Sequence, residues 1–316
     1  MLSIPVSAVV PTRDRRDALS RTLSSLAGQC LIPRELIVVD ASRDSSTKDL
    51  LVEFARIVGD SCGVRWVAAQ TAGAAVQRNQ GTALATEKVV WYFDDDILFE
   101  PDCVARLWRT LDSDDRLGGV NAMITNQQYR APGRLSRLMF RMMSGRSLPS
   151  YAGLVLGPAW NLLPEDSESC PEVVPVEWLN LGCTLYRRAA LPNPPFSGPF
   201  AGYSLMEDLA LSLTVGKNWK LANVRTARIF HDSQPGAHKS DLGEIAEMEL
   251  INRHYIMSTI LGRRRAVDYL KLIALEVFSL ASAARRWPPG AVLWPELRGK
   301  MRALVRMFQS RGSGNR

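Results

Sequence analysis

Cysteine is scarce in this sequence and forms no recognisable motif. The chain of 316 residues has 5 cysteines. They are widely spaced and include no CxxC pair: Cys30, Cys62, Cys103, Cys170 and Cys183. An odd, scattered set disfavours a disulfide framework and a structural zinc site, and it indicates a reducing compartment.

The two common glycine-rich phosphate loops are also missing. Pro11-Thr12-Arg13-Asp14-Arg15 follows the first apolar run, Val6–Val10, where a dinucleotide-binding GxGxxG would stand. The sequence has no GxxxxGK[ST] either, which excludes a P-loop. If the protein handles phosphates, other groups must do so, and a metal ion with oxygen ligands is the natural one.

Long uncharged apolar runs are absent as well. The most apolar stretch, Val267–Trp287, is interrupted by Asp268, Lys271 and Glu276. We therefore expect no membrane-spanning helix. The first residues, Met1–Pro5, lead into a strand without a basic or long apolar leader. We expect no signal peptide and a cytoplasmic protein.

The basic charge is concentrated at one end. The formal net charge is +7, and residues 236–316 carry the excess, with 14 basic against 7 acidic residues. A neutral body with a basic tail indicates an anionic surface that the tail touches. We predict one globular domain over residues 1–235 and a helical, basic C-terminal extension over residues 236–316.

Apolar runs alternate with amphipathic segments in the first half of the chain. The predicted strands are Val6–Val10, Leu36–Val39, Val64–Ala69, Val89–Phe93 and Leu117–Ile124. This order predicts an α/β fold with a mostly parallel central sheet flanked by helices.

The alternation breaks between residues 125 and 175, which indicates a functional lid or docking surface. After the break the pattern resumes, and the predicted elements are a strand at Trp178–Tyr186, a helix at Glu207–Val215, and two short strands at Trp219–Val224 and Ala227–Phe230.

Three adjacent carboxylates, Asp94-Asp95-Asp96, follow the apolar strand Val89–Phe93. Such groups repel one another and are costly to desolvate, so they need a compensating cation. Mg²⁺ or Mn²⁺ carrying a substrate's phosphates fits this position, because ligands bind at the carboxyl ends of strands in open α/β sheets. The alternative is an acidic turn that caps the next helix.

Polar groups stand at two more places on the same predicted edge. Asp40 ends the second strand and could accept hydrogen bonds from a ribose or a base. The alternative is an aspartate that bonds locally in a turn. Arg78-Asn79 places polar groups near the same edge, within an alanine-rich helix. The alternative is a plain amphipathic helix, which explains the alanines equally well.

A second acidic site and a histidine lie further along the chain. Glu207-Asp208 begins a predicted helix. The helix dipole favours an ionised carboxylate there, which could act as a general base. The alternative is that the two acids only cap the helix. His231 ends a predicted strand, where it is either a metal ligand or a structural histidine.

Taken in order, these residues resemble the family 2 glycosyltransferases of the GT-A fold. The matching elements, over roughly residues 4–235, are Val9–Arg13, Leu36–Asp40, Arg78-Asn79, Phe93–Asp96, Asn180–Gly182, Glu207-Asp208 and His231. The resemblance implies an inverting, hexosyltransferase-like enzyme that moves one sugar from a nucleotide-diphosphate donor to a hydroxyl of a glycan or lipid-linked acceptor. It also implies a divalent cation, Mn²⁺ or Mg²⁺, and a role in polysaccharide or glycolipid synthesis.

The resemblance assigns a role to each matching residue. The nucleotide-sugar would contact Pro11, Thr12, Arg13, Asp40, Arg78, Asn79, Asp94, Asp95 and Gly182. The metal ligands would be Asp94, Asp96 and His231. Asp208 would be the catalytic base with Glu207 as its neighbour, and Trp178 would contact the acceptor.

Two departures from the family pattern limit what the resemblance implies about the donor and the reaction. Asp40-Ala41-Ser42 replaces the commoner Asp-Asp-Ser, which leaves the nucleoside open. A QxxRW element is absent, because Ala283 stands where the glutamine before Arg286-Trp287 should be. This argues against a processive synthase. A sugar nucleotidyltransferase and a non-catalytic nucleotide-sugar-binding protein are the alternative functions.

The tail contains a basic amphipathic pattern. Leu297, Met301, Leu304, Val305 and Phe308 share one predicted helix face, and Arg298, Lys300, Arg302 and Arg306 occupy the other. This is typical of peripheral attachment to an anionic membrane surface. The alternative is a helical pair packed on the rest of the protein. We expect no nucleic-acid binding, because aromatic residues are few and no known module is present.

Overall fold

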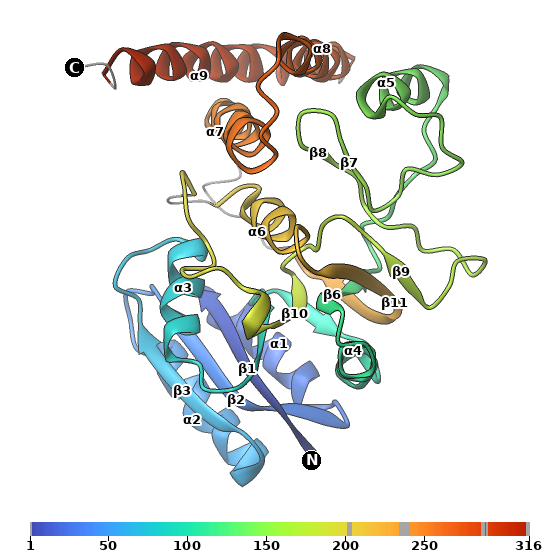
Figure 1. Ribbon diagram of the computed structural model, residues 1–316. Coiled ribbons are helices and arrows are strands. Elements are labelled where there is room, and N and C mark those ends of the chain that lie inside the picture. The colour runs from blue at the N-terminus through green and yellow to red at the C-terminus, as the bar shows by residue number, and fades with distance from the viewer. Residues whose placement is uncertain (1, 201–203, 234–240, 286–287, 289, 314–316) are drawn as a thin grey trace. The chain divides into compact units, whose positions relative to one another are not determined.

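The computed structural model describes residues 2–200, 204–233, 241–285, 288 and 290–313, without the side chains of residues 308 and 310–313 (Figure 1). The predicted boundary at residues 235 and 236, residues 201–203 and Arg286-Trp287 lie outside this set. The chain divides into two compact units. The first comprises residues 1–131, 150–154 and 161–234; the second comprises 132–149, 155–160 and 235–316.

The first unit is built on a mixed sheet with the strand order β3-β2-β1-β4-β10-β6-β11-β5. Its strands are β1 (Leu2–Thr12), β2 (Leu31–Asp40), β3 (Gly63–Ala68), β4 (Val89–Phe93), β5 (Ile97–Phe99), β6 (Leu117–Ile124), β9 (Val173–Pro175), β10 (Cys183–Arg187) and β11 (Lys220–His231). Strands β3, β2, β1 and β4 are parallel, and β10 runs antiparallel between β4 and β6. The predicted α/β class is confirmed.

Three details of the sheet differ from the sequence prediction. Strand β11 is continuous where two short strands were expected, and a register shift between Val224 and Arg228 marks the predicted break. The strand expected from Trp178 begins only at Cys183. The short strand β5, which pairs antiparallel with β11, was not predicted because three residues carry too little periodicity.

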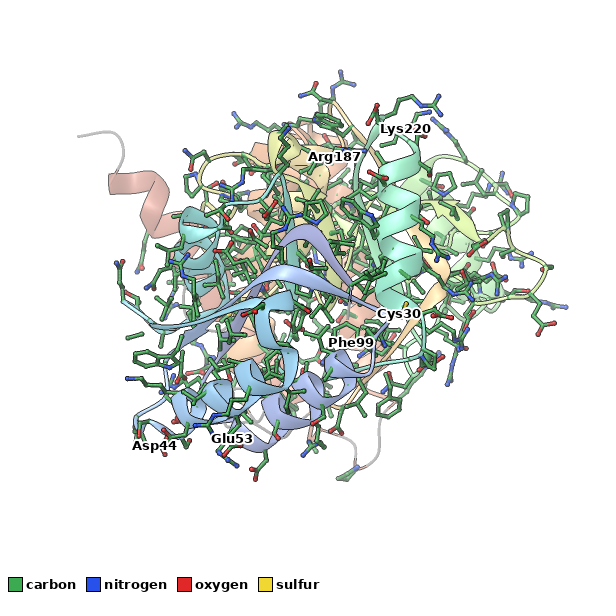
Figure 2. All side chains as sticks on the ribbon, turned by 90° about the horizontal axis from the view of Figure 1, so that it is seen from below. Cys30, Asp44, Glu53, Phe99, Arg187 and Lys220 are labelled. Atoms are coloured by element: carbon green, nitrogen blue, oxygen red, sulfur yellow. The ribbon has the colours of Figure 1, made fainter. Side chains whose placement is uncertain are left out.

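Helices cover both faces of the sheet. They are α1 (Arg16–Ala27), α2 (Ser46–Val58), α3 (Ala74–Leu84), α4 (Cys103–Ser113) and α6 (Glu207–Val215), with short helical turns η1 (Gly59–Ser61) and η2 (Arg188–Ala190). Apolar residues of α1, α2 and α4 pack into one core with alternate residues of β1 and β2. Phe99, labelled in Figure 2, lies among the rings of Trp91 and Phe93 in this core.

Helix α3 lies on the opposite face of β1 and β2. Ile37 and Val39 form a separate cluster there with Ala85, and Leu84 packs against it. A Cβ atom on Gly81 would approach a side-chain carbon of Val9 to 2.4 Å, so only glycine lets this helix lie so close to the strand. This close packing brings the polar end of α3 to the carboxyl ends of the strands.

The second unit is mainly helical. It contains α5 (Arg134–Ser144), the two-residue strands β7 (Val155–Leu156) and β8 (Trp160–Asn161, whose Asn161 falls in the first unit), α7 (Leu242–Tyr255), the π-helical turn η4 (Ile256–Ile260), α8 (Ala266–Ala283) and α9 (Leu293–Ser313). Leu250, Met257, Leu272 and Ala303 form its core. None of the helices in the described part of the chain has the length and hydropathy needed to cross a bilayer.

The basic side chains of α9 mostly bind acidic residues of their own unit. Lys300 pairs with Glu276, and Arg302 and Arg306 pair with Glu247 at 2.7 and 2.8 Å. Helix α9 therefore packs on α7, while Met301, Leu304 and Val305 of the predicted apolar face stay exposed. The predicted anionic leaflet is not needed to neutralise these three cations.

Candidate active site

Parallel pairing brings several loops to one edge of the sheet. Thr12 pairs with Asp40, and Asp40 pairs with Ala68, so β1, β2 and β3 end side by side. Asp94 follows the last residue of β4, and its amide donates a hydrogen bond to Gly182 O at 3.2 Å. The acidic triplet therefore lies at the carboxyl edge of the sheet, where ligands bind in open α/β folds.

Each carboxylate of the triplet has different partners. Asp94, the most exposed of the three, accepts a hydrogen bond from Arg78 at 2.7 Å. Asp95 is buried and accepts from Thr12 Oγ1 at 2.6 Å and from Arg15 at 3.2 Å. Asp96 is also buried and lies 3.0 Å from Arg15.

Two arginines supply much of the compensating charge that the triplet requires. Arg15 bridges Asp95 and Asp96, and Arg78 binds Asp94. Burial nevertheless raises the pKa of Asp95 to about 6, against the opposing effects of Thr12 and Arg15. The two arginines therefore compensate only part of the negative charge of the three carboxylates, and an additional cation would stabilise their ionised forms.

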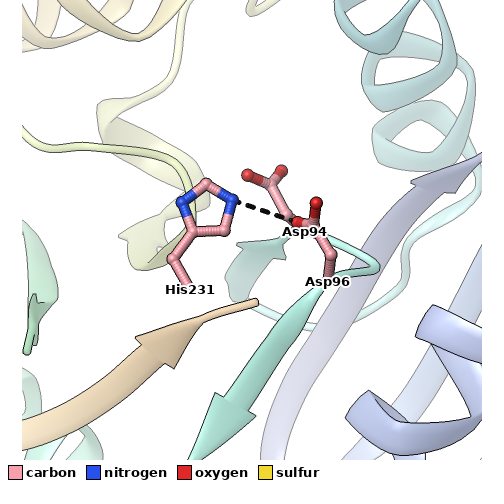
Figure 3. Close-up of side chains that lie close together, drawn as sticks. All are labelled: Asp94, Asp96 and His231. Atoms are coloured by element: carbon pink, nitrogen blue, oxygen red, sulfur yellow. Dashed lines mark hydrogen bonds and ion pairs between the residues drawn. The ribbon is translucent and has the colours of Figure 1, made fainter. Parts of the chain in front are cut away.

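Asp94, Asp96 and His231 form a group that suits a divalent cation (Figure 3). One ligand atom from each lies within 4.8 Å of the others. His231 Nε2 lies 3.1 Å from Asp96 Oδ1, and its Nδ1 lies 3.0 Å from the amide nitrogen of Gln127. Two carboxylates and an imidazole are suitable ligands for Mn²⁺, so the residues present fit the predicted metal.

A second pair of acids is joined to the triplet through Arg78. Glu207 and Asp208 begin helix α6, and Arg78 donates to Glu207 at 2.9 Å while its other nitrogen binds Asp94. The side chain of Arg78 is only 4% exposed. This buried guanidinium therefore holds the start of α6 beside the carboxyl edge of the sheet.

The two acids of α6 have different surroundings. Glu207 is buried and accepts a hydrogen bond from Arg78. Asp208 is half-buried and accepts a hydrogen bond from Leu209 N at 2.7 Å. Burial raises the pKa of both carboxyl groups, and Arg78 opposes the rise in each. The helix dipole alone predicted a fully ionised carboxylate, but burial acts in the opposite direction and leaves Asp208 more basic than an ordinary aspartate.

Two predicted nucleotide contacts already make hydrogen bonds within the protein. Asp40 accepts from Ser42 N at 2.9 Å and from the Trp66 indole at 3.0 Å. The local turn that was the alternative for Asp40 is therefore present. Asn79 exchanges two hydrogen bonds with the backbone of Phe196, at 2.7 and 3.0 Å. Both residues fix loops at the edge, and their contacts with a nucleotide stay predictions.

The other predicted residues occupy three kinds of position. Pro11 is buried at the end of β1, and Arg13 is exposed beside Asp14. Gly182 is buried and anchors the backbone of Asp94. Trp178 is buried, with its indole N–H donated to Leu162 O at 2.7 Å. An acceptor contact of Trp178 therefore stays a prediction.

Part of the chain matches a known family model. Residues 7–153 match the family model "Glycosyl transferase family 2". The chain contains a family 2 glycosyl transferase domain. A comparison with curated protein sequences finds no match.

Solved structures share the fold of this glycosyl transferase. The mannosyltransferase PcManGT from Pyrobaculum calidifontis, in complex with GDP-Man and Mn²⁺, is 13% identical with a TM-score of 0.57, covering 96% of this chain and 87% of that chain. S. aureus TarS 1–349, in complex with UDP-GlcNAc, is 16% identical with a TM-score of 0.58, covering 97% and 81%. GalNAc-T7 with UDP, GalNAc and Mn²⁺ is 16% identical with a TM-score of 0.52, covering 78% and 47%. These likenesses confirm the GT-A fold.

Sequence reasoning missed two residues of the candidate site. Arg15 was noted only as part of a polar loop, although it binds two of the three triplet carboxylates. An arginine placed so soon after a buried strand was a usable signal. Gln127, which contacts His231, lies in the irregular segment after β6. No sequence pattern pointed to it, because that contact spans 104 positions.

Proposed function

We propose that this glycosyl transferase moves a single sugar from a nucleotide-diphosphate donor to an acceptor hydroxyl, with inversion at the anomeric carbon. The observation that carries the proposal is the buried bridge from Asp94 through Arg78 to Glu207. It joins the acidic edge that suits a donor and its cation to the helix that carries the candidate base.

The donor proposal rests on the edge loops and on the structural neighbours. Pro11, Thr12 and Asp40 lie on the two strand ends where a nucleoside would bind, and Arg13 directly follows the end of β1. PcManGT was solved with GDP-Man, and TarS with UDP-GlcNAc. We therefore assign a nucleoside diphosphate sugar to this edge. Arg78, Asn79, Asp95 and Gly182 would contact or support it.

A divalent cation would be held by Asp94, Asp96 and His231, and would supply positive charge for the diphosphate leaving group. Mn²⁺ is the first choice, because the set includes an imidazole and PcManGT was solved with this ion. Arg15 keeps Asp96 in place from the other side at 3.0 Å. The buried carboxylates are thus oriented before any donor binds.

Asp208 would accept the proton of the acceptor hydroxyl while that oxygen attacks the anomeric carbon. One carbon–oxygen bond forms as the bond to the diphosphate breaks, so the configuration inverts and no covalent enzyme intermediate is needed. Glu207 is already bound to Arg78, which leaves Asp208 as the base. The acceptor would be a glycan or a lipid-linked sugar, with Trp178 at its site.

Product analysis with a panel of nucleotide sugars tests the reaction. We expect Mn²⁺-dependent release of nucleoside diphosphate and, with an acceptor, a product of inverted configuration in the NMR spectrum. The variant Asp208→Asn tests the proposed base. Its matched control is Asp112→Asn, which replaces an exposed acid on α4. A retained configuration would contradict the single displacement. Formation of nucleotide sugar from a sugar phosphate and a nucleoside triphosphate would indicate a nucleotidyltransferase instead.

A further inference from the structure

Helix α8 of the second unit exposes an apolar side. Four of its large residues are more than half exposed: Val267, Leu270, Ile273 and Val277, at 51%, 64%, 59% and 60%. Apart from these, the exposed residues of the helix are Ala266, Ala281 and Ser282. No charged side chain is therefore in the exposed set of this 18-residue helix.

Two of the three charged residues of α8 bind neighbouring elements, and the third, Asp268, accepts a hydrogen bond from Arg265 N at the start of the helix. Lys271 donates to Met143 O at 2.9 Å, and Glu276 binds Arg253 at 3.3 Å and also binds Lys300. In a helix on the surface of a water-soluble domain, the polar side normally faces outward. Here the arrangement is reversed, which indicates that an apolar medium or partner covers the outer side.

Helix α5 packs close to α8 and adds positive charge. Phe140 contacts Trp160 with ring centroids 4.8 Å apart, and Trp160 contacts Phe278 at 5.9 Å. The outer residues of α5 alternate between apolar and basic, and all are exposed: Arg134, Leu135, Arg137, Leu138, Arg141 and Met142. No acidic residue occurs between positions 117 and 164.

We propose that the exposed residues of α5 and α8 together form a surface that binds an anionic lipid leaflet, with both helices lying in its plane. Arginines that alternate with leucines fit a layer of phosphate headgroups above acyl chains. The uncharged side of α8 enters an apolar layer without desolvating a charge. Met301, Leu304 and Val305 of α9 are exposed as well, so attachment through that helix is a separate prediction.

Vesicle sedimentation with the full-length protein tests the proposal. We expect binding to phosphatidylcholine vesicles that contain phosphatidylglycerol, and weaker binding at high salt. Leu270→Ser with Ile273→Ser should reduce the partition coefficient by about tenfold or more. Arg137→Gln with Arg141→Gln should reduce it by about tenfold on phosphatidylglycerol vesicles and leave binding to pure phosphatidylcholine unchanged.

Matched control variants lie on the first unit. Val52→Ser with Ile57→Ser removes apolar residues that are 48% and 62% exposed on α2. Arg56→Gln with Arg109→Gln removes two exposed charges. Both controls should bind vesicles like the unchanged protein. The assay needs no nucleotide sugar, so its result is independent of the proposed reaction.

Three outcomes would overturn the proposal. The first is that the unchanged protein fails to sediment with phosphatidylglycerol vesicles at low salt. The second is that the α5 and α8 variants bind as well as their controls. The third is that sedimentation velocity shows an oligomer that is lost in the Leu270→Ser, Ile273→Ser variant, while vesicle binding is unchanged. The surface would then be a contact between copies of this chain.

Discussion

Removing Arg78 should destabilise the first unit far more than removing an exposed arginine. Arg78→Met keeps most of the side-chain volume but leaves Asp94 and buried Glu207 without their cation. Breaking a buried ion pair by deleting one partner costs about 3–5 kcal/mol. For a unit of roughly 200 residues this lowers Tm by roughly 7–11 °C. Arg34→Met is the matched control, because Arg34 pairs with Glu87 at 3.0 Å but is 56% exposed, and such pairs contribute about 0–1 kcal/mol.

Thermal unfolding followed by circular dichroism measures both variants under the same conditions. Adding Glu207→Gln to Arg78→Met should recover part of the lost stability, because it removes the more deeply buried of the two uncompensated charges. Asp94 is 28% exposed and can be partly hydrated. If Arg78→Met melts close to the Arg34→Met control, or if Glu207→Gln gives no recovery, the bridge does not hold α6 to the acidic edge.

Three further predictions concern the chemistry. Asp96→Asn should weaken Mn²⁺ binding, measured by electron paramagnetic resonance, by about 100-fold or more, since it removes a ligand beside His231; binding as tight as that of the control Asp112→Asn would refute the metal assignment. Asp208→Asn should lower turnover by about 10²–10⁴-fold while calorimetry shows unchanged donor binding; full activity in this variant would exclude Asp208 as the base. Turnover should fall as the pH drops through about 6, because burial raises the pKa of Asp208 to about 6 and its protonated form accepts no proton; turnover that stays constant between about pH 5 and 7 would contradict this assignment.

Periodicity and turn residues were enough to predict the first four strands along the chain, whereas their order in the sheet came only from the structure. Strand β4 and helix α6 begin and end at the predicted residues, since both follow from clear apolar runs with polar ends. The break after residue 124 was also apparent. However, the sequence did not show that residues 132–149 and 155–160 join the C-terminal helices in one unit. That grouping depends on contacts such as Trp160 with Phe278, which no local pattern encodes.

The amino-acid order alone was enough to predict the α/β class, the acidic triplet at a strand end and the two acids at a helix start. These features are local, because each depends on neighbouring residues and on the periods of strands and helices. Which of these groups come into contact became visible only in the folded chain. It placed Arg15 between Asp95 and Asp96, and it buried Arg78 between the two acidic sites. It also turned the charged side of α8 inward. Such pairings depend on side chains that are distant in sequence, and their free energy depends on burial, which exists only once the chain has folded.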